Sequence, residues 1–245
     1  SYTRVLTMLS VRLAIYLVAR LFCAWGGMTA AITASMLYDL VSCPHRVRMD
    51  VYGDPADRDP INPFIEMLWE NGSLYETEVI EKLGMPFLDL STYSGDEKEQ
   101  RTTEAIQQGV PLIYSARMRE GDLLGDPDLL RKETGGYVAG DIKSGAGEEG
   151  DEDNRKPKKH YAVQLALYAD ILERKGRSPG RRAFVWDVHG EEVAYDFDAP
   201  LGVRNPTTLW DFYRESLRAA ANSPNLSDYG QTFDKRRLQH RKSAA

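Results

Sequence analysis

Asp141 and Lys143 stand two positions apart in YVAGDIKSG (137–145), an otherwise apolar run that is predicted to be a β-strand. Successive side chains of a strand alternate between its two faces, so Asp141 and Lys143 share one face while Val138 and Ile142 share the other. Charged residues are depleted in strands and are rarely buried without a partner. The pair therefore indicates a chemical role for this strand.

A second acid, Asp128 in GDPDLL (125–130), precedes Asp141 by thirteen residues. This separation leaves room for one strand, a short turn and most of the next strand, so pairing of the two strands would bring the carboxylates together. Clustered carboxylates repel each other unless a cation or a proton lies between them, and Mg²⁺ prefers oxygen ligands. The spacing therefore predicts a metal site, at which Lys143 would oppose the negative charge of a phosphoryl transition state.

The helix predicted around SLYETEVIEKLG (73–84) offers a third acid. Glu76, Ile80 and Leu83 follow each other at i, i+4 and i+7, so Glu76 is predicted to face the core. Glu78 and Glu81 point elsewhere and are predicted to be solvated. The inward Glu76 is either a salt-bridge partner or a group that binds a metal ion or orients water.

A later helix, HYAVQLALYADILERKG (160–176), carries Gln164 and Tyr168 four residues apart on neighbouring positions of its surface. Tyr168 belongs to the predicted buried stripe and could serve core packing alone. Gln164 lies at the edge of that stripe, where its amide could hold a carboxylate or a phosphate.

The remaining pattern predicts an α/β (α+β) layer fold. Helices are predicted over 33–53, 63–84, 94–109, 160–176 and 208–223, and strands over 110–120, 123–133, 136–144 and on both sides of His189 within 182–198. Residues 145–159 combine an acidic block with a basic one and read as a solvated loop or as a flap that contacts substrate. The expected organisation is a leader over 1–32, a catalytic domain over 33–223 and a disordered basic tail over 224–245.

Composition sets wider limits. The chain has 245 residues, of which 42% are hydrophobic and 28% charged, with a formal net charge of −6. The chain has no overall positive charge that would indicate nucleic-acid binding. A local basic patch could still neutralise phosphates in a salt-dependent way. That patch would comprise the tail and Arg155, Lys156, Lys158 and Lys159. The two cysteines are too few for a disulfide framework, which favours a reducing, cytoplasmic setting.

The apolar N-terminal run, residues 5–25, is interrupted by Arg12 and Arg20. An arginine at the centre of a membrane costs about 2.5–3.5 kcal/mol on insertion scales, so no membrane span is expected. Three interpretations stay open: an amphipathic helix, a non-native leader ahead of a start at Met28, and a membrane signal.

Taken together, GSLYE (72–76), GDPD (125–128), GDIK (140–143) and QLALY (164–168) resemble the PD-(D/E)xK nuclease superfamily, specifically its RecB-like branch. The segments occur in the family's order and at its spacing, and SCPHRVRMD (42–50) is similar to the family's start. The resemblance covers roughly residues 35–198. It implies a restriction-endonuclease-like core, in which a central mixed sheet is flanked by helices.

The resemblance also implies a metal centre. Asp128, Asp141 and the main-chain carbonyl of Ile142 would bind Mg²⁺ or Mn²⁺, and Glu76 would bind the metal directly or through water. The chemistry implied is metal-assisted hydrolysis of a phosphodiester bond, in which the ion lowers the pKa of bound water and orients the attack.

Other roles are implied for residues around that centre. Lys143 would position and polarise the attacking water, and Gln164 and Tyr168 would support the substrate or the lysine. The substrate implied is DNA that is single-stranded or has free ends. The partners implied are other repair or CRISPR-type proteins, or a C-terminal domain that is missing here.

Two departures from the family pattern stand out. Many RecB-like members carry histidine where this chain has Tyr75, and tyrosine is a poor metal ligand at neutral pH. Cys43 occupies the first position of the four-cysteine iron–sulfur site found in some relatives, but no downstream trio follows it, so no iron–sulfur cluster is expected.

The predicted function is that of a divalent-metal-dependent deoxyribonuclease, acting as an exonuclease. One alternative is a catalytically impaired nuclease fold that serves as a nucleic-acid-binding or scaffold module, which Tyr75 favours. A second is a glycoside hydrolase, whose paired carboxylates would need neither a metal nor the intervening lysine.

Overall fold

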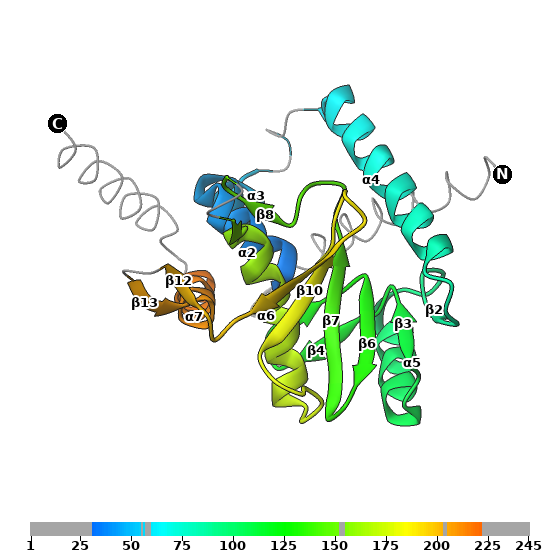
Figure 1. The fold of residues 1–245 in the computed structure, drawn as a ribbon. Helices are drawn as coiled ribbons and strands as arrows, with labels where there is room; N and C mark the ends of the chain where they lie inside the picture. Colours follow the sequence, from blue (N-terminus) through cyan, green and yellow to red (C-terminus); the bar gives the residue numbers. More distant parts are fainter. Residues whose placement is uncertain (1–30, 55, 57–59, 152–154, 203–204, 222–245) are drawn as a thin grey trace. The chain divides into compact units, whose positions relative to one another are not determined.

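The computed structural model describes residues 31–54, 56, 60–151, 155–202 and 205–221 (Figure 1). The chain divides into two units after Ala31, and every helix and strand described here belongs to the second, Ile32–Ala245. Residues 1–30 of the predicted leader, with its three interpretations, and the whole of the predicted basic tail over 224–245 lie outside the described residues. Within the described segments, we find no helix with the length and hydrophobicity of a membrane span.

The helices and strands follow each other in the order β1 (Ile32–Thr33), α2 (Ala34–Ser42), α3 (Pro44–Tyr52), α4 (Pro63–Lys82), β2 (Leu88–Asp89), α5 (Gly95–Gln108), β3 (Leu112–Tyr114), β4 (Met118–Glu120), β5 (Leu123–Gly125), β6 (Leu129–Glu133), β7 (Gly136–Ile142), β8 (Glu148–Glu149), β9 (Lys156–Pro157), α6 (Lys159–Arg174), β10 (Arg182–Trp186), β11 (Glu192–Asp196), β12 (Pro200–Gly202), β13 (Asn205–Thr208) and α7 (Leu209–Ala221).

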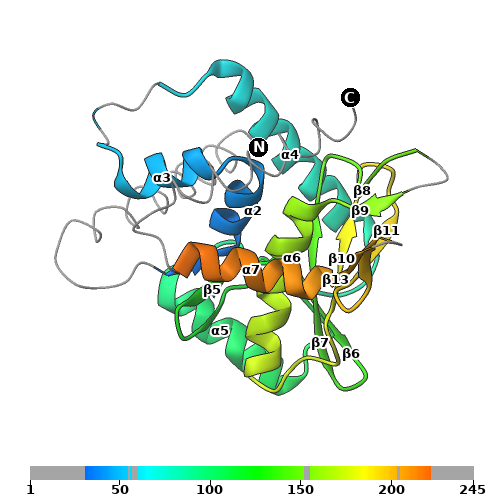
Figure 2. The same cartoon turned by 90° about the vertical axis from the view of Figure 1, so that its left-hand side faces the viewer.

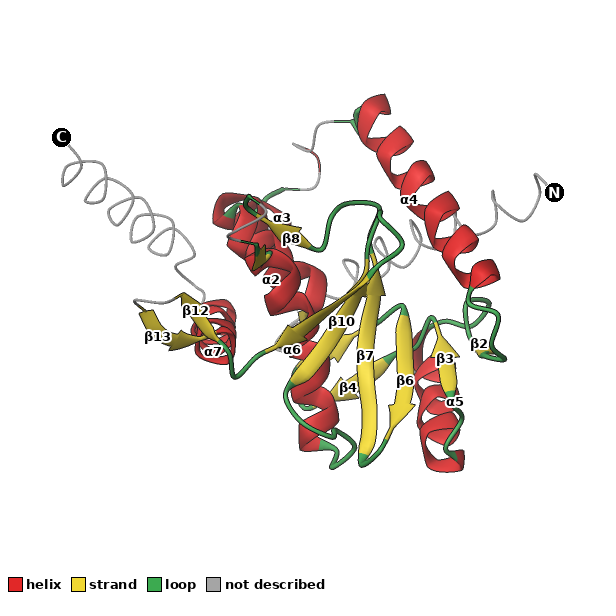
Figure 3. Ribbon diagram, viewed as in Figure 1, coloured by secondary structure: helices red, strands yellow, loops and turns green. Residues whose placement is uncertain are grey.

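A six-stranded mixed sheet forms the centre, in the order β11-β10-β7-β6-β3-β2 (Figure 3). Strand β7 pairs antiparallel with β6 and parallel with β10, and β11 adds an antiparallel edge strand. On the other side β3 pairs antiparallel with β6 and parallel with β2. The predicted mixed sheet flanked by helices is confirmed, and β7, which carries the Asp141 motif, lies inside it.

The two faces of β7 pack into different clusters, as the alternation of its side chains predicts. Ala139 belongs to the larger core, which it shares with α6. Val138 and Ile142 belong to a smaller cluster with Val79 and Ile80 of α4. Asp141 and Lys143 therefore follow Ala139 along the face that packs on α6, whereas α4 packs against the opposite face through Val79 and Ile80.

The helical layer on the α6 side is built around α6 itself, against which α2 and α7 pack (Figure 2). The predicted buried stripe of α6 is confirmed: Tyr161, Leu165, Tyr168 and Leu172 are all buried. A buried polar contact fixes α7 on α6, since the Tyr213 hydroxyl donates to Asp170 Oδ2 at 2.6 Å.

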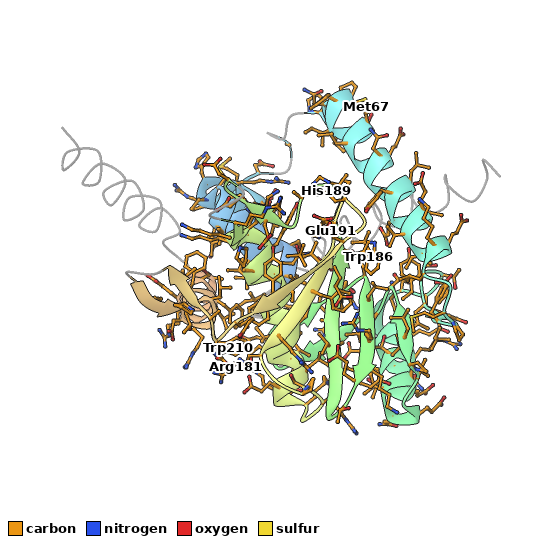
Figure 4. The ribbon with its side chains drawn as sticks, in the orientation of Figure 1. Met67, Arg181, Trp186, His189, Glu191 and Trp210 are labelled. Carbon is orange, nitrogen blue, oxygen red and sulfur yellow. The ribbon has the colours of Figure 1, made fainter. Side chains whose placement is uncertain are left out.

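At the far end of the same layer, Arg181 stacks on Trp210 with 4.4 Å between its guanidinium carbon and the ring centroid (Figure 4). Trp186, at the end of β10, packs instead against the smaller cluster beside α4 (Figure 4). The two tryptophans thus belong to the two different faces of the sheet.

The predicted helix over 33–53 is wrong in one respect, because two helices meet at Cys43. A residue that precedes proline is disfavoured in the α conformation, and Cys43 before Pro44 is extended, with φ −158°. Thr33 caps the first of these helices by accepting a hydrogen bond from the Met36 N–H, and Gly53 ends the second.

The predicted strands over 110–120 and 123–133 are each broken into two. Their inner halves, β4 and β5, join β1 in a separate three-stranded sheet, while β3 and β6 stay in the central one. The breaks fall at Ser115, which has a positive φ of 58°, and at Pro127, which has no N–H for a strand ladder. Strands β1, β2, β12 and β13 and the β8–β9 pair were not predicted.

Candidate active site

The two predicted metal-binding acids lie side by side where β6 and β7 pair. Leu129 lies opposite Gly140 in the antiparallel register, so Asp128 lies opposite Asp141. The Asp128 N–H donates to Asp141 Oδ1 at 3.4 Å, and the Ile142 N–H donates to Asp128 Oδ2 at 2.9 Å. Each carboxylate is therefore held by a backbone amide near the other, and the predicted approach of the two acids is confirmed.

Lys143 completes this group. Its Nζ lies 2.7 Å from Asp141 Oδ2, and the side chain of Asp141 is only 1% exposed whereas that of Lys143 is 20% exposed. Burial by itself lowers the pKa of Lys143, but the charges of Asp141 and Asp128 outweigh it and raise the pKa above its usual range. Lys143 is therefore an ammonium group at neutral pH, suited to stabilise negative charge on a phosphate and unsuited to act as a base.

The surroundings of Asp128 disfavour its charged form, whereas those of Lys143 favour the charged form. Burial raises its pKa well above the usual range, and the charges of Asp141 and Glu76 raise it further, against a lowering effect of Lys143. Two neighbouring carboxylates with one ammonium leave an excess of negative charge in a dry setting. Such a group favours the uptake of a proton or a cation.

The residues present fit a hard divalent cation. Asp141 Oδ2 is buried and, within the described segments, has no hydrogen-bond donor in normal geometry, although the Lys143 ammonium lies 2.7 Å away. The donors around it are carboxylate oxygens, which Mg²⁺ and Mn²⁺ prefer. Among the residues that the structure describes, however, no three or more His, Cys, Asp and Glu side chains are grouped so that they could hold a metal ion.

Glu76, the predicted third acid, reaches the site from the other face of the sheet. It lies on α4, is 9% exposed and accepts a hydrogen bond from the Tyr114 hydroxyl at 2.8 Å. Its charge contributes to the raised pKa of Asp128, so the two carboxylates are electrostatic neighbours. The inward orientation of Glu76 is confirmed, and the exposure of Glu78 and Glu81 also agrees with the sequence.

Gln164 and Tyr168 lie beside the Asp128 loop. Gln164 Nε2 donates to the Tyr168 hydroxyl at 3.2 Å, and this hydroxyl donates to the Asp126 carbonyl at 3.3 Å. The Tyr168 ring also packs on Gly125, where an added Cβ would lie 2.6 Å from its Cδ1. Tyr168 thus holds the GDPD turn in place, while Gln164, half-buried, stays at the rim as expected.

A model of the PD-(D/E)XK nuclease superfamily matches residues 66–240. The chain belongs to the PD-(D/E)XK nuclease superfamily. Pro127-Asp128 and Asp141-Ile142-Lys143 match the letters of the superfamily's name, and they are the residues that the β6–β7 pairing brings together. Members of this superfamily are typically metal-dependent nucleases. A search of curated proteins found no match to the chain.

The sequence did not single out three residues that support the superfamily's motif. Tyr161 was assigned only to the core, yet its ring centroid lies 5.5 Å from Lys143 Nζ. Tyr114 is the donor to Glu76. Asp187 is 3% exposed, and its Oδ2 accepts the Gly147 N–H at 3.1 Å, which ties down the segment after β7. Only Tyr161 carried a usable signal, because it shares the α6 stripe with Tyr168.

Tyr75, at the position where many RecB-like nucleases carry histidine, has a structural contact. Its hydroxyl donates to the main-chain carbonyl of Asp187, in the β10–β11 turn. Burial and then the charge of Asp187 raise its pKa above the usual range. Tyr75 therefore joins α4 to the turn next to the site as a neutral phenol.

Replacing Tyr75 by phenylalanine removes this hydrogen bond and little else. Because a net intramolecular hydrogen bond contributes about 1 kcal/mol, Tyr75→Phe is expected to lower the free energy of unfolding by about that amount. Urea denaturation measures the change, and DNA cleavage at a temperature where both proteins are folded should be unaltered. Loss of cleavage without loss of stability would show that the phenol takes part in the chemistry.

Proposed function

We propose that this chain is a divalent-metal-dependent deoxyribonuclease of the RecB-like branch, acting as an exonuclease on DNA that is single-stranded or has free ends. The observation that carries the proposal is the group of Asp128, Asp141 and Lys143 on one face of β6 and β7, with the ammonium 2.7 Å from Asp141. This group combines the acids that a cation needs with a positive charge for the phosphate.

Asp128, Asp141 and the main-chain carbonyl of Ile142 would hold Mg²⁺ or Mn²⁺. When bound, the ion would lower the pKa of a coordinated water and neutralise the scissile phosphate. Lys143 would donate hydrogen bonds to the attacking water or to a phosphate oxygen, where negative charge develops.

The surrounding residues would act on the substrate and the water. Glu76 would bind the metal directly or through water, from the α4 side, since its charge acts on Asp128. Gln164, which is half-buried, and Tyr168, whose hydroxyl contacts the GDPD turn, would support the substrate or the catalytic lysine. The proposed function does not involve an iron–sulfur cluster in this chain.

The wider setting that we propose is cytoplasmic, with other repair or CRISPR-type proteins, or a further C-terminal domain, as partners. Cys43, a free and exposed thiol, is compatible with a reducing compartment.

Divalent cations are expected to stabilise the fold, which can be measured without any cleavage. At a concentration one hundred times the dissociation constant, a bound ion stabilises the native state by about 2.7 kcal/mol. For a chain of this size, this corresponds to a rise of about 5–10 °C in the unfolding midpoint. Differential scanning fluorimetry with Mg²⁺ or Mn²⁺ should show the rise, and EDTA should reverse it.

Two variants provide the comparison. Asp128→Asn removes one candidate ligand and should lose the rise, whereas Glu78→Gln alters an exposed carboxylate of α4 and should keep it. An equal rise in both variants would place the cation elsewhere on the protein and remove the metal assignment.

The activity itself is tested with labelled DNA in Mg²⁺ or Mn²⁺. Linear single strands and duplexes with free ends should be degraded, closed circles should be spared, and EDTA should stop the reaction. Cleavage of closed circles would make the enzyme an endonuclease. Hydrolysis of glycosides that survives EDTA would replace the nuclease by the glycosidase alternative. DNA binding without cleavage would favour the alternative of an impaired nuclease fold.

A further inference from the structure

Ser115, which follows β3, has a backbone conformation that serine seldom adopts. Its φ is 58°, and it is the one non-glycine residue with a positive φ among those that the structure describes. Its N–H donates to the Asp128 carbonyl at 2.7 Å, so Ser115 extends the register of β3 and β6 by one residue and lies opposite a candidate metal ligand. Glycine would adopt this conformation at lower cost, so a hydroxyl here suggests that the side chain is used.

Lys98 brings an ammonium group to that hydroxyl. It lies in the first turn of α5, and its Nζ is 2.7 Å from Ser115 Oγ. Thr102, one turn later on the same side of α5, accepts the Arg117 N–H at 3.0 Å and donates to the Lys98 carbonyl at 2.8 Å. Ser115 itself lies in the turn after β3, and the Thr102–Arg117 hydrogen bond ties the Lys98 turn of α5 to the same segment.

The contact belongs to the catalytic side of the sheet. Helix α5 packs with Ala105 and Ile106 into the larger core, which is the cluster of Ala139 and therefore the face of Asp141 and Lys143. Strand β3 is the direct neighbour of β6, and paired strands lie about 4.8 Å apart. A nucleic-acid strand with one phosphate at Asp128 and Asp141 would bring a neighbouring phosphate toward Ser115.

We propose that Lys98 and Ser115 bind the phosphate next to the scissile one in the substrate strand. The ammonium supplies charge and rotatable donors, and the hydroxyl supplies a further donor in a fixed place. The pair positions the strand for Lys143 and the metal ligands. This inference rests on the proposed nuclease function, and it extends that function by a binding site for the sugar–phosphate backbone.

Binding of a labelled single-stranded oligonucleotide tests the pair, with Ca²⁺ in place of Mg²⁺ and a series of salt concentrations. Lys98→Met should weaken binding about fivefold and reduce the salt slope by about 0.7, the value for one lost contact with single-stranded DNA. Lys98→Arg should restore both quantities. Lys132→Met, an equal charge change where the ammonium contacts the Gly109 carbonyl at the other end of α5, should leave both at the wild-type values.

Ser115 is tested by two replacements that share the loss of the hydroxyl and differ in backbone preference. Ser115→Ala and Ser115→Gly should weaken binding alike, and should raise the KM for cleavage while kcat changes little. Wild-type affinity in Ser115→Gly would show that only the backbone matters and would overturn the role of the hydroxyl. The glycine variant also serves if Lys98→Met fails to fold.

The outcomes separate this inference from the function on which it rests. If the wild type binds and cleaves DNA while Lys98→Met keeps its affinity and salt slope, the phosphate site is refuted and the nuclease stands. If the wild type neither binds nor cleaves DNA, both are refuted.

Discussion

Replacing Lys143 by methionine is expected to lower kcat for DNA cleavage by about 10²- to 10³-fold, the usual effect of removing one group that stabilises transition-state charge. Methionine keeps most of the side-chain volume but removes the ammonium that lies 2.7 Å from Asp141 Oδ2. Because the charges of Asp141 and Asp128 raise the pKa of Lys143, the wild-type group carries its proton at any pH near neutrality. Single-turnover cleavage with saturating enzyme measures the effect on the chemical step.

Lys82→Met supplies the matched control. Lys82 is 76% exposed on α4 and forms only a surface contact with Glu78, so the same change of charge should leave kcat unaltered. Divalent-cation stabilisation should persist in Lys143→Met, because the acids are still present. A Lys143→Met enzyme that cleaves DNA at the wild-type rate would remove the catalytic assignment of this lysine.

Replacing Gly140 by valine is expected to lower the free energy of unfolding by about 3 kcal/mol, at the upper end of the usual range for an overfilled core. A Cβ at Gly140 would lie 2.3 Å from the Phe184 ring, which is 3% exposed and belongs to the smaller cluster. The Arg131 guanidinium carbon lies 4.2 Å from the centroid of that ring, so the ring has little room to move. Urea denaturation of the metal-free protein measures the loss.

A second-site change separates crowding from a general intolerance of β7. Phe184→Leu removes the ring that the introduced valine side chain would strike, so the double variant should be more stable than the sum of the two single effects predicts. Gly72→Ala is the control for a glycine without a close neighbour, since its Cβ would meet only Ser144 Oγ at 4.0 Å. In the middle of α4 this change should stabilise the fold by about 0.5–1 kcal/mol. Strict additivity of Gly140→Val and Phe184→Leu would contradict the explanation.

The local pattern of the sequence was enough to predict most of the secondary structure. The 3.6-residue period placed α6 and its buried tyrosines, and it placed Glu76 toward the core. The two-residue alternation of a β-strand placed Asp141 on the face opposite to that of Val138 and Ile142. Both periods arise from backbone geometry within one element, so they can be read without knowing what that element packs against.

The sequence predicted the part of the candidate site that the β6–β7 pairing determines. A separation of thirteen positions from Asp128 to Asp141 suits two antiparallel strands with a short turn, and the structure has this pairing. The motif with Lys143 was therefore recognisable from the sequence. The catalytic and metal-binding roles of these residues remain predictions for the assays above.

Only the tertiary structure decided how separate elements meet. The sequence did not show that Glu76 approaches from the face opposite Asp141, or that Tyr75 donates to a carbonyl 112 residues later. It also did not show that Lys98 contacts Ser115, because the residue pattern of a polar helix or of a strand end does not indicate which other element it packs against. Within an element, the regular backbone determines which way a side chain points. Contacts between elements depend on the shape and volume of all the packed side chains, and those are decided only when the whole chain folds.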